Sequence, residues 1–380
     1  MSIPLVNKKI FFVAQGLNGG IASATSQLAI NLNKDGWTPF VVFVGRPAKN
    51  NNKVLLLSNG VQCLEIVTSH RRSTGEVINI LRSIRTISKQ ATSFEPDVIV
   101  LSGIIPAIFY APILKLRMSK PIVIWEHGPQ LSYSSIKKYL FYFSNFFIDS
   151  HISVSKSSNV FYTSLFSYVD VNKSTIIENA VDFSTYDRQD LSKDDAFAFL
   201  NIIVIARLDL FQKDHRTIIK AASLLKANNI PFHIDFAGDG PDKSLLSNFI
   251  VKMGLSGQIT ILGQVEYIPQ LLSKYNICCL STKYEGGPSL AIIEGFASGL
   301  LCIASDVIGV SDAITNGHNG ILFEYNNHEQ LSSKLIWIIN NPLQSSQIAN
   351  TGYQEGLVRF DSKCQTSKFG SHLSKMLALK

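Results

Sequence analysis

Two positively charged side chains flank a short loop in the second half of the chain. Arg207 ends a predicted strand, and Lys213 stands just before a predicted helix whose first turn carries Asp214. An arginine can grip two phosphate oxygens at once, a lysine acts as a point charge, and the free amides of a helix N-terminus add partial positive charge. This pattern is typical of a pyrophosphate clamp, but surface pairing of the two cations with Asp209 and Asp214 would explain it equally well.

A glycine-rich turn followed by a carboxylate forms the second group, within residues 284–295. Two glycines after Glu285 allow the backbone to approach a ligand closely. Pro288 and Ser289 then begin a predicted helix, with Ser289 at its N-cap. Glu294 lies in this helix among apolar residues, so a solvated position is the less favoured interpretation. A carboxylate there can accept two hydrogen bonds from a vicinal diol such as a ribose.

The first half of the chain offers weaker signals. His127 closes a predicted strand and is followed by Gly128, but a lone histidine is more often a structural residue than a catalytic one. Glu126 beside it is interpreted as structural. Gly19 and Gly20 form a turn between the first predicted strand and helix, and any such turn can need glycines. None of these residues identifies a reaction by itself.

Two common nucleotide-binding motifs are missing. The segment Gly238–Lys243 follows a strand but lacks both the third glycine of a dinucleotide-binding loop and the Lys-Ser/Thr pair of a Walker loop. The sequence contains no Asp-x-Asp triplet to hold a divalent ion. It therefore supports neither an ATPase nor a dinucleotide-dependent dehydrogenase.

Short runs of β-branched and aromatic residues alternate with longer helical patterns, which is typical of βαβ units and parallel sheets. The predicted strands are Lys9–Ala14, Pro39–Val44, Asp97–Leu101, Pro121–Trp125, His151–Val154, Ser174–Ile177, Asn201–Ala206, His233–Ala237, Gln258–Leu262, Asn276–Leu280 and Leu301–Ala304. The predicted helices are Ile21–Lys34, Val77–Lys89, Ser134–Phe147, His215–Lys226, Asp242–Lys252, Ile268–Lys274, Leu290–Ser298 and His328–Asn340. Ligands of such sheets bind at the carboxyl ends of the strands, where the loops described above begin.

The element pattern predicts two doubly wound, Rossmann-like α/β domains that face each other across a cleft. The polar segment Asp182–Asp195 is interpreted as the linker. We expect an N-terminal domain at residues 1–184 and a C-terminal domain at residues 185–360. A final helix at residues 361–380 is expected to pack back toward the N-terminal domain.

The composition excludes several classes of protein. Of the 380 residues, 46% are hydrophobic and 17% charged, so the chain can bury sizeable cores and lacks the signature of disorder. The net charge of +7 lies wholly in residues 1–190, which hold 19 basic and 12 acidic residues, while residues 191–380 hold 16 of each. A neutral second half argues against a protein built around nucleic acid, and leaves one basic domain suited to an anionic substrate or membrane.

The cysteines and the apolar runs indicate a compartment. The five cysteines are scattered and lack a Cys-x-x-Cys pair, so we expect a reducing compartment and neither a disulfide scaffold nor structural zinc. The apolar run Tyr139–Ile148 is much shorter than the roughly 20 residues that span a bilayer. The run Ile10–Ala14 is shorter than a signal-peptide core. We therefore expect a soluble, cytoplasmic protein.

Taken together, these motifs resemble the family-4 retaining glycosyltransferases, whose GT-B fold consists of two Rossmann-like domains. The resemblance is carried by Arg207 with Lys213, Phe236–Pro241, Ile261–Gly263, Glu285–Pro288 with Glu294, and Asn316–Phe323. It extends more loosely through Asn18–Gly20, Trp125–Gly128 and Ile177–Asp182. The ordered motifs cover nearly the whole chain.

The resemblance implies a role for each matched residue. Arg207 and Lys213 would hold the donor diphosphate, and Glu294 the nucleotide ribose. His127 would reach the reacting sugar, and Arg207, Lys213, Glu285 and His127 would form the catalytic set. The remaining donor contacts would come from Glu285, Gly286, Gly287, Pro288, Ser289 and Leu290 for the sugar and phosphate, Gln264 and Val265 for the base, and Gly19 and Gly20 for the phosphates.

The spacing of the two glutamates departs from the family. Eight residues separate Glu285 from Glu294, one more than the family has, so the strict family position falls on Gly286. An insertion in the turn would leave Glu285 in place. The departure concerns Glu285, whereas Glu294 keeps its place in the motif.

The implied activity is transfer of a sugar from a nucleoside-diphosphate sugar to an acceptor hydroxyl, with retention of anomeric configuration. Arg207, Lys213 and helix N-termini would meet the charge on the leaving phosphate, so no metal and no other cofactor is expected. The departing phosphate would take the acceptor proton. Two alternatives stay open, namely a sugar-nucleotide epimerase of similar fold and a non-catalytic partner that binds a nucleotide sugar.

The acceptor is expected against the basic first domain, as a lipid-linked saccharide or a growing surface polysaccharide. Basic residues there lie near the aromatic run 139–147, and are Lys115, Arg117, Lys120, Lys137 and Lys138. One hypothesis is that this segment docks on the anionic inner face of the plasma membrane. The equally weighted alternative is that the aromatic residues are the core of a packed helix.

Overall fold

The computed structural model describes residues 7–17, 19–45, 51–68, 74–128, 135–165, 174–193 and 195–378. The chain divides into two compact units. Unit 1 holds the residues up to Glu178 together with those from Ser362 onward, and unit 2 holds Asn179–Asp361. The sequence predicted a boundary after residue 184, but Val181 and Phe183 are buried in the core of unit 2. The second unit therefore begins earlier, and the segment interpreted as a linker belongs to it.

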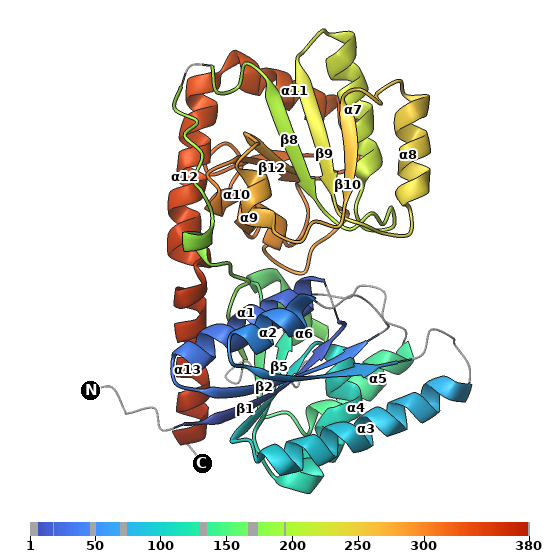
Figure 1. Cartoon of the computed structure of the whole chain (residues 1–380), viewed down its shortest axis with the longest axis vertical. Helices are drawn as coiled ribbons and strands as arrows, with labels where there is room; N and C mark the ends of the chain where they lie inside the picture. Colours follow the sequence, from blue (N-terminus) through green and yellow to red (C-terminus); the bar gives the residue numbers. More distant parts are fainter. Residues whose placement is uncertain are drawn as a thin grey trace. The chain divides into compact units, whose positions relative to one another are not determined.

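Unit 1 is built on a parallel sheet of seven strands in the order β3-β2-β1-β4-β5-β6-β7. Figure 1 labels β1, β2 and β5 of this sheet. The strands are β1 (Lys9–Gln15), β2 (Thr38–Gly45), β3 (Gln62–Val67), β4 (Val98–Ser102), β5 (Ile122–Glu126), β6 (Ser150–Ser153) and β7 (Ser174–Ile176). The helices are α1 (Gly20–Lys34), α2 (Asn51–Ser58), α3 (Thr74–Phe94), α4 (Ile104–Met118), α5 (Ser135–Asn145), α6 (Lys156–Leu165) and α13 (Ser362–Ala378).

Helices cover both faces of this sheet. Successive side chains of a strand point to opposite faces, and Phe12 of β1 packs with Leu28 of α1 and Phe369 of α13. On the other face, Phe11 belongs to the cluster that contains Ala107 of α4 and Phe141 of α5. Burial on both sides explains why the central strands are almost continuously apolar. The final helix of the chain is thus part of the core of unit 1.

Unit 2 contains a parallel sheet of six strands in the order β10-β9-β8-β11-β12-β13. Figure 1 shows β8, β9 and β10 side by side in this sheet. The strands are β8 (Leu200–Ile205), β9 (Phe232–Ala237), β10 (Ile259–Gly263), β11 (Ile277–Leu280), β12 (Leu301–Ser305) and β13 (Ile321–Phe323). The helices are α7 (His215–Ala227), α8 (Lys243–Lys252), α9 (Ile268–Leu272), α10 (Leu290–Ala297), α11 (His328–Asn340) and α12 (Pro342–Phe360), with a short 3-10 helix at Phe183–Thr185.

Helix α10 lies tightly against two neighbouring strands of this sheet. Cys278 of β11 pairs in register with Cys302 of β12, and both side chains are fully buried. Gly295 of α10 sits over them. A Cβ at this position would lie 2.7 Å from the Cys302 Sγ and 2.8 Å from the Cys278 Cβ. The glycine therefore sets how closely α10, which carries Glu294, approaches the sheet.

The predicted alternation of strands and helices is confirmed in both units, and each predicted strand is present to within one residue at either end. The prediction missed β3, β13, α2, α4, α6 and α12. Strand β3 is a half-buried edge strand with Glu65 inside it, and β13 has only three residues, so neither forms a long apolar run. Pro112 lies inside α4 and obscures its helical pattern.

Gly295→Ala should destabilise the chain by about 1–3 kcal/mol, because the added methyl group overpacks the two cysteines. The midpoint of urea-induced unfolding measures this loss. Gly257→Ala is the matched control, since a Cβ there meets no atom within 4 Å and should leave the midpoint unchanged or slightly raised. Equal midpoints for the two variants would show that α10 is not held this closely.

Candidate functional site

The loop that follows β8 carries the first cation of the predicted clamp. The Arg207 side chain is 68% exposed, and its Nη1 lies 3.7 Å from Oδ2 of Asp209. An exposed pair of this kind contributes little to stability, so the guanidinium can turn toward a ligand with little loss. This contact is one half of the surface pairing that the sequence left open.

Two glycines after β9 hold this loop in place. A Cβ on Gly238 would lie 1.9 Å from the carbonyl oxygen of Ala206. A Cβ on Gly240 would lie 2.2 Å from the carbonyl oxygen of Leu208. The Leu208 amide also donates a hydrogen bond to the Asp239 carbonyl at 3.1 Å. The Gly-x-Gly pattern that matched no nucleotide-binding loop thus allows two backbone segments to touch.

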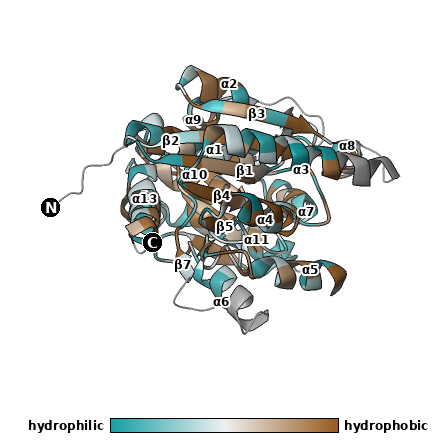
Figure 2. Cartoon of the chain, turned by 90° about the horizontal axis from the view of Figure 1, so that it is seen from below, coloured by the Kyte–Doolittle hydropathy of each residue, from teal (hydrophilic) through white to brown (hydrophobic). Residues whose placement is uncertain are grey.

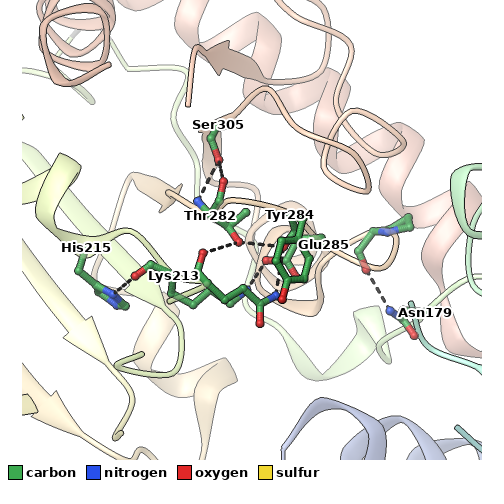
Figure 3. Close-up of polar contacts among 9 residues, drawn as sticks. Asn179, Lys213, His215, Thr282, Tyr284, Glu285 and Ser305 are labelled. Atoms are coloured by element: carbon green, nitrogen blue, oxygen red, sulfur yellow. Dashed lines mark hydrogen bonds and ion pairs between the residues drawn. The ribbon is translucent and has the colours of Figure 1, made fainter. Parts of the chain in front are cut away.

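Lys213, the second cation, forms an ion pair with Glu285 (Figure 3). Both side chains are largely buried, with 14% and 12% of their surface exposed. Asp214, which the surface-pairing alternative assigned to the cations, instead caps α7 and accepts a hydrogen bond from the Thr217 amide at 3.3 Å. Lys213 is therefore directed at the glycine-rich turn and not at its neighbour in sequence.

Buried polar contacts tie together the two loops that carry this ion pair (Figure 3). The Ser305 hydroxyl of β12 donates to the Thr282 carbonyl at 2.8 Å and accepts from the Thr282 amide at 2.9 Å. The Thr282 hydroxyl donates to the Tyr284 carbonyl at 3.0 Å, and the side-chain amide of Gln212 donates to the same carbonyl at 3.1 Å. These hydrogen bonds therefore fix the positions of the two loops that carry the ion pair.

The glycine-rich turn ends at the start of α10. Ser289 occupies the N-cap position with φ −66° and ψ 134°, and its side chain makes no capping hydrogen bond with the described residues. The first amides of α10 can therefore serve an anion, as helix N-termini commonly do. Asn179 steadies the turn, since its Nδ2 donates to the Pro288 carbonyl at 3.0 Å (Figure 3). The other predicted contact residues of the turn are buried Gly287 and half-buried Gly286 and Leu290.

Glu294 lies in the second turn of α10. Burial raises the pKa of its carboxyl to about 8, and a hydrogen bond from Tyr186 acts in the opposite direction. Burial first and the contact with Glu294 second raise the pKa of Tyr186, so its hydroxyl stays a donor. At neutral pH the carboxyl is therefore mostly protonated, and hydroxyl donors from a bound diol would favour its charged form.

Two residues of this site were not predicted from the sequence. Tyr186 lies in the segment interpreted as a linker, where the available signal was the pair of aromatic residues Phe183 and Tyr186 in a polar run. His215 begins α7, and its Nδ1 donates to the Lys213 carbonyl at 3.1 Å (Figure 3). Burial lowers the pKa of His215 to about 4. The ring is therefore neutral at pH 7 and fixes the Lys213 backbone without adding charge.

The residues expected near the base follow β10, the edge strand of the same sheet. Gln264 is exposed, and Val265 is half-buried against the cluster that contains Leu272 and Ile292. Both residues stand at the carboxyl end of a strand, as Arg207 does. Among the described residues, no group of three or more His, Cys, Asp and Glu side chains could hold a metal ion.

Unit 1 carries the remaining predicted residues at the carboxyl end of its own sheet. Gly19 precedes α1 with φ 90°, a backbone conformation that other residues rarely adopt. Gly20 is the first residue of α1, and both glycines are exposed. A helix N-terminus opened by glycines is accessible to an anion.

His127 follows β5 and contacts the Trp125 ring, with 4.2 Å between the ring centroids. The buried Glu126 carboxylate accepts hydrogen bonds from the His127 amide at 3.2 Å and from the Gly128 amide at 3.3 Å. Glu126 therefore shapes the turn that presents His127, in keeping with the structural role predicted for it. The residues that continue this turn, and Asn18 of the first glycine turn, lie outside the described part of the chain.

Two family models account for most of the chain. The model described as "Glycosyl transferases group 1" matches residues 188–355. The model described as "Glycosyltransferase Family 4" matches residues 18–185. The first match contains Arg207, Lys213, Glu285 and Glu294, and the second contains Gly19, Gly20 and His127.

Curated relatives match over part of their length. The chain is 27% identical over 245 residues to the Campylobacter jejuni "GalNAc-alpha-(1->4)-GalNAc-alpha-(1->3)-diNAcBac-PP-undecaprenol alpha-1,4-N-acetyl-D-galactosaminyltransferase", with 63% of this chain and 64% of the relative covered. It is 29% identical over 187 residues to the Escherichia coli "UDP-Gal:alpha-D-GlcNAc-diphosphoundecaprenol alpha-1,3-galactosyltransferase", with 46% and 47% covered. The matched segments thus span less than two thirds of either relative.

A solved structure matches the whole chain. The crystal structure of HepE from Anabaena in complex with UDP and glucose superposes with a TM-score of 0.80 at 19% identity, covering 97% of this chain and 100% of that chain. A likeness at this identity shows the fold. The predicted GT-B fold of two parallel-sheet α/β domains is confirmed.

The unliganded protein should lose stability as the pH rises from about 5 to about 8, by at most roughly 1.4 kcal/mol per pH unit. The folded pKa of Glu294 is about 8 against an ordinary value of 4.5. The protonated carboxyl therefore contributes its full stabilisation at a pH below its ordinary pKa. This stabilisation is lost as the pH rises toward the pKa of the folded state. Urea midpoints measured across this range should fall, and Glu294→Gln should remove most of the fall. An unchanged fall in the variant would assign the dependence to other groups.

Proposed function

We propose that this chain, which belongs to the GT-B glycosyltransferases of group 1 and family 4, transfers a sugar from a nucleoside-diphosphate sugar to an acceptor hydroxyl with retention of anomeric configuration. The observation that carries the proposal is the presence in unit 2 of exposed Arg207, the Lys213–Glu285 pair and the uncapped start of α10. Two cations and a helix N-terminus at the carboxyl ends of parallel strands are suited to a diphosphate.

The proposed chemistry depends on charge that is in place before the reaction. The leaving diphosphate gains negative charge as its bond to the sugar breaks, while positive charge grows on the sugar ring. Arg207 can bind two phosphate oxygens and Lys213 supplies a point charge. Fixed charges of this kind stabilise the transition state without reorganisation. We propose that no divalent ion is needed and that the departing phosphate takes the proton of the acceptor hydroxyl.

The contacts of Glu285 support a role for it despite its altered spacing from Glu294. Lys213 pairs with its carboxylate, and its amide donates to the Ile308 carbonyl at 3.0 Å. We propose that this carboxylate accepts hydroxyl groups of the donor sugar while Lys213 and the amides that follow contact the adjacent phosphate. Glu294 would accept the ribose diol, with Tyr186 holding the carboxyl in place.

The acceptor is proposed from the relatives. The names of the Campylobacter and Escherichia proteins specify undecaprenol-linked acceptors. We therefore propose a lipid-linked saccharide as the acceptor, within the assembly of a surface polysaccharide at the cytoplasmic face of the plasma membrane. The roles that the family resemblance implies for His127, Gly19 and Gly20 of unit 1 stay predictions.

Arg207→Ala should lower the transfer rate by about a hundredfold, the effect typical of losing one preorganised charge in the transition state. The unfolding midpoint should not change, because the side chain is mostly exposed. Lys252→Ala, at the last residue of α8, removes another exposed cation and should leave the rate unchanged. A near-normal rate in Arg207→Ala contradicts the clamp.

Thermal unfolding with a panel of UDP and GDP sugars, in buffer containing EDTA, should identify the donor. A ligand at 100 times its Kd stabilises the folded state by about 2.7 kcal/mol. Incubating the stabilising sugar nucleotide with acceptor should then yield a glycosylated product. Conversion of the donor sugar without an acceptor would instead indicate an epimerase, and binding without turnover a non-catalytic partner. No stabilisation by any member of the panel would contradict the proposed donor site.

A further inference from the structure

Helix α5 of unit 1 exposes a concentrated set of apolar side chains. Six of the 24 exposed large apolar side chains in the described chain fall within residues 136–146. Their exposed fractions lie between 43% and 76%, and they are Ile136, Tyr139, Leu140, Tyr142, Phe143 and Phe146. Figure 2 shows brown, apolar segments of this helix next to teal, hydrophilic ones. Scattered exposed apolar residues need no explanation, but a contiguous set marks an interaction surface.

The helix is anchored by a different face. Phe141 is 1% exposed and Ser144 is fully buried, and Phe141 packs on the sheet with Ile148 beyond the helix. The outward stripe has helical spacing and consists of Ile136, Tyr139, Leu140 and Phe143. The alternative that the aromatic run is ordinary core therefore holds for Phe141, but it is wrong for this outward stripe.

Basic side chains lie on α5 and on α4, the helix that packs against it. Lys137 and Lys138 lie in the first turn of α5 and are exposed. Arg117 is exposed near the end of α4. An ion pair of 2.5 Å between Lys115 and Asp149 joins the end of α4 to the chain just past α5. Lys115 is thus a structural contact, and the basic groups of this surface are the two lysines of α5 and Arg117.

We propose that the outward stripe, together with Phe146, Lys137, Lys138 and Arg117, is a surface that docks on an anionic phospholipid bilayer. Helices of this kind lie in the plane of the interface, with apolar side chains among the lipids and basic side chains near anionic headgroups. None of the described helices is long and apolar enough to cross a membrane. The inference rests on unit 1 alone and does not require the proposed transfer.

Charge decides between a bilayer and a second copy of the chain. The whole net charge of +7 lies in residues 1–190, which include α5. In a symmetric dimer each copy would present the same patch to the other, so two patches that contain basic side chains and no acidic one would face each other. An anionic bilayer instead attracts each basic residue near its surface.

Cosedimentation of the full chain with phosphatidylglycerol vesicles tests the proposal, with phosphatidylcholine vesicles as the neutral reference. Partitioning should favour the anionic vesicles and weaken with added salt. Lys137→Ala with Lys138→Ala should reduce it by about fivefold per lysine. Phe143→Ser with Phe146→Ser should reduce it by about tenfold or more. Val358→Ser, on α12 and 77% exposed, is the matched control and should partition as the parent does.

Equal partitioning to neutral and anionic vesicles, unchanged partitioning of the α5 variants, or no binding at all would each overturn the proposal. Sedimentation velocity tests whether the outward stripe instead binds a second copy of the chain. If the parent is a dimer and the two Phe substitutions convert it to a monomer, the stripe is a dimer interface. Sugar transfer to a water-soluble acceptor is measured separately and should persist in the α5 variants. Failure of vesicle binding and failure of the proposed transfer are thereby distinguishable.

Discussion

The ion pair between Lys213 and Glu285 is the contact on which the candidate donor site of unit 2 depends. It joins the loop after β8 to the loop after β11, and both side chains are largely removed from water. A charge in such a place is stabilised by its partner and is unfavourable when left alone. The Ser305 hydroxyl holds Thr282 in the loop after β11, and the side-chain amide of Gln212 joins the loop after β8 to the Tyr284 carbonyl. A phosphate that reaches this site meets a cation already held in position, which is the condition for strong electrostatic stabilisation.

The sequence was sufficient to predict the edge of the sheet at which several of these residues stand. Arg207 and Lys213 lie in the loop after β8 and Glu285 in the loop after β11, and parallel strands bring such positions to one edge of a sheet. The partner of each charge could not be predicted. Lys213 and Glu285 lie 72 residues apart, and their contact requires β8 to lie beside β11, which no local pattern specifies.

The roles of Tyr186 and of the glycines after β9 also could not be predicted from local sequence. Polar composition around Tyr186 indicated a linker, yet tertiary contacts place its hydroxyl on Glu294. The segment with Gly238 and Gly240 lacks the other residues of a Walker or dinucleotide-binding loop, and the sequence offered no other role for these glycines. Their actual function is close backbone packing against Ala206 and Leu208. Composition describes one segment by itself, whereas each of these roles arises from a contact between two segments.

The membership of α13 in unit 1 affects how the chain can fold during synthesis. Phe369 and Leu373 are fully buried in the cluster that holds Phe12. The ribosome synthesises these two residues only after the whole of unit 2. Until then, part of one face of the unit 1 sheet stays uncovered. Unit 2 is continuous from Asn179 to Asp361 and can close its core first. Unit 2, although most of unit 1 is translated before it, can therefore finish folding before unit 1.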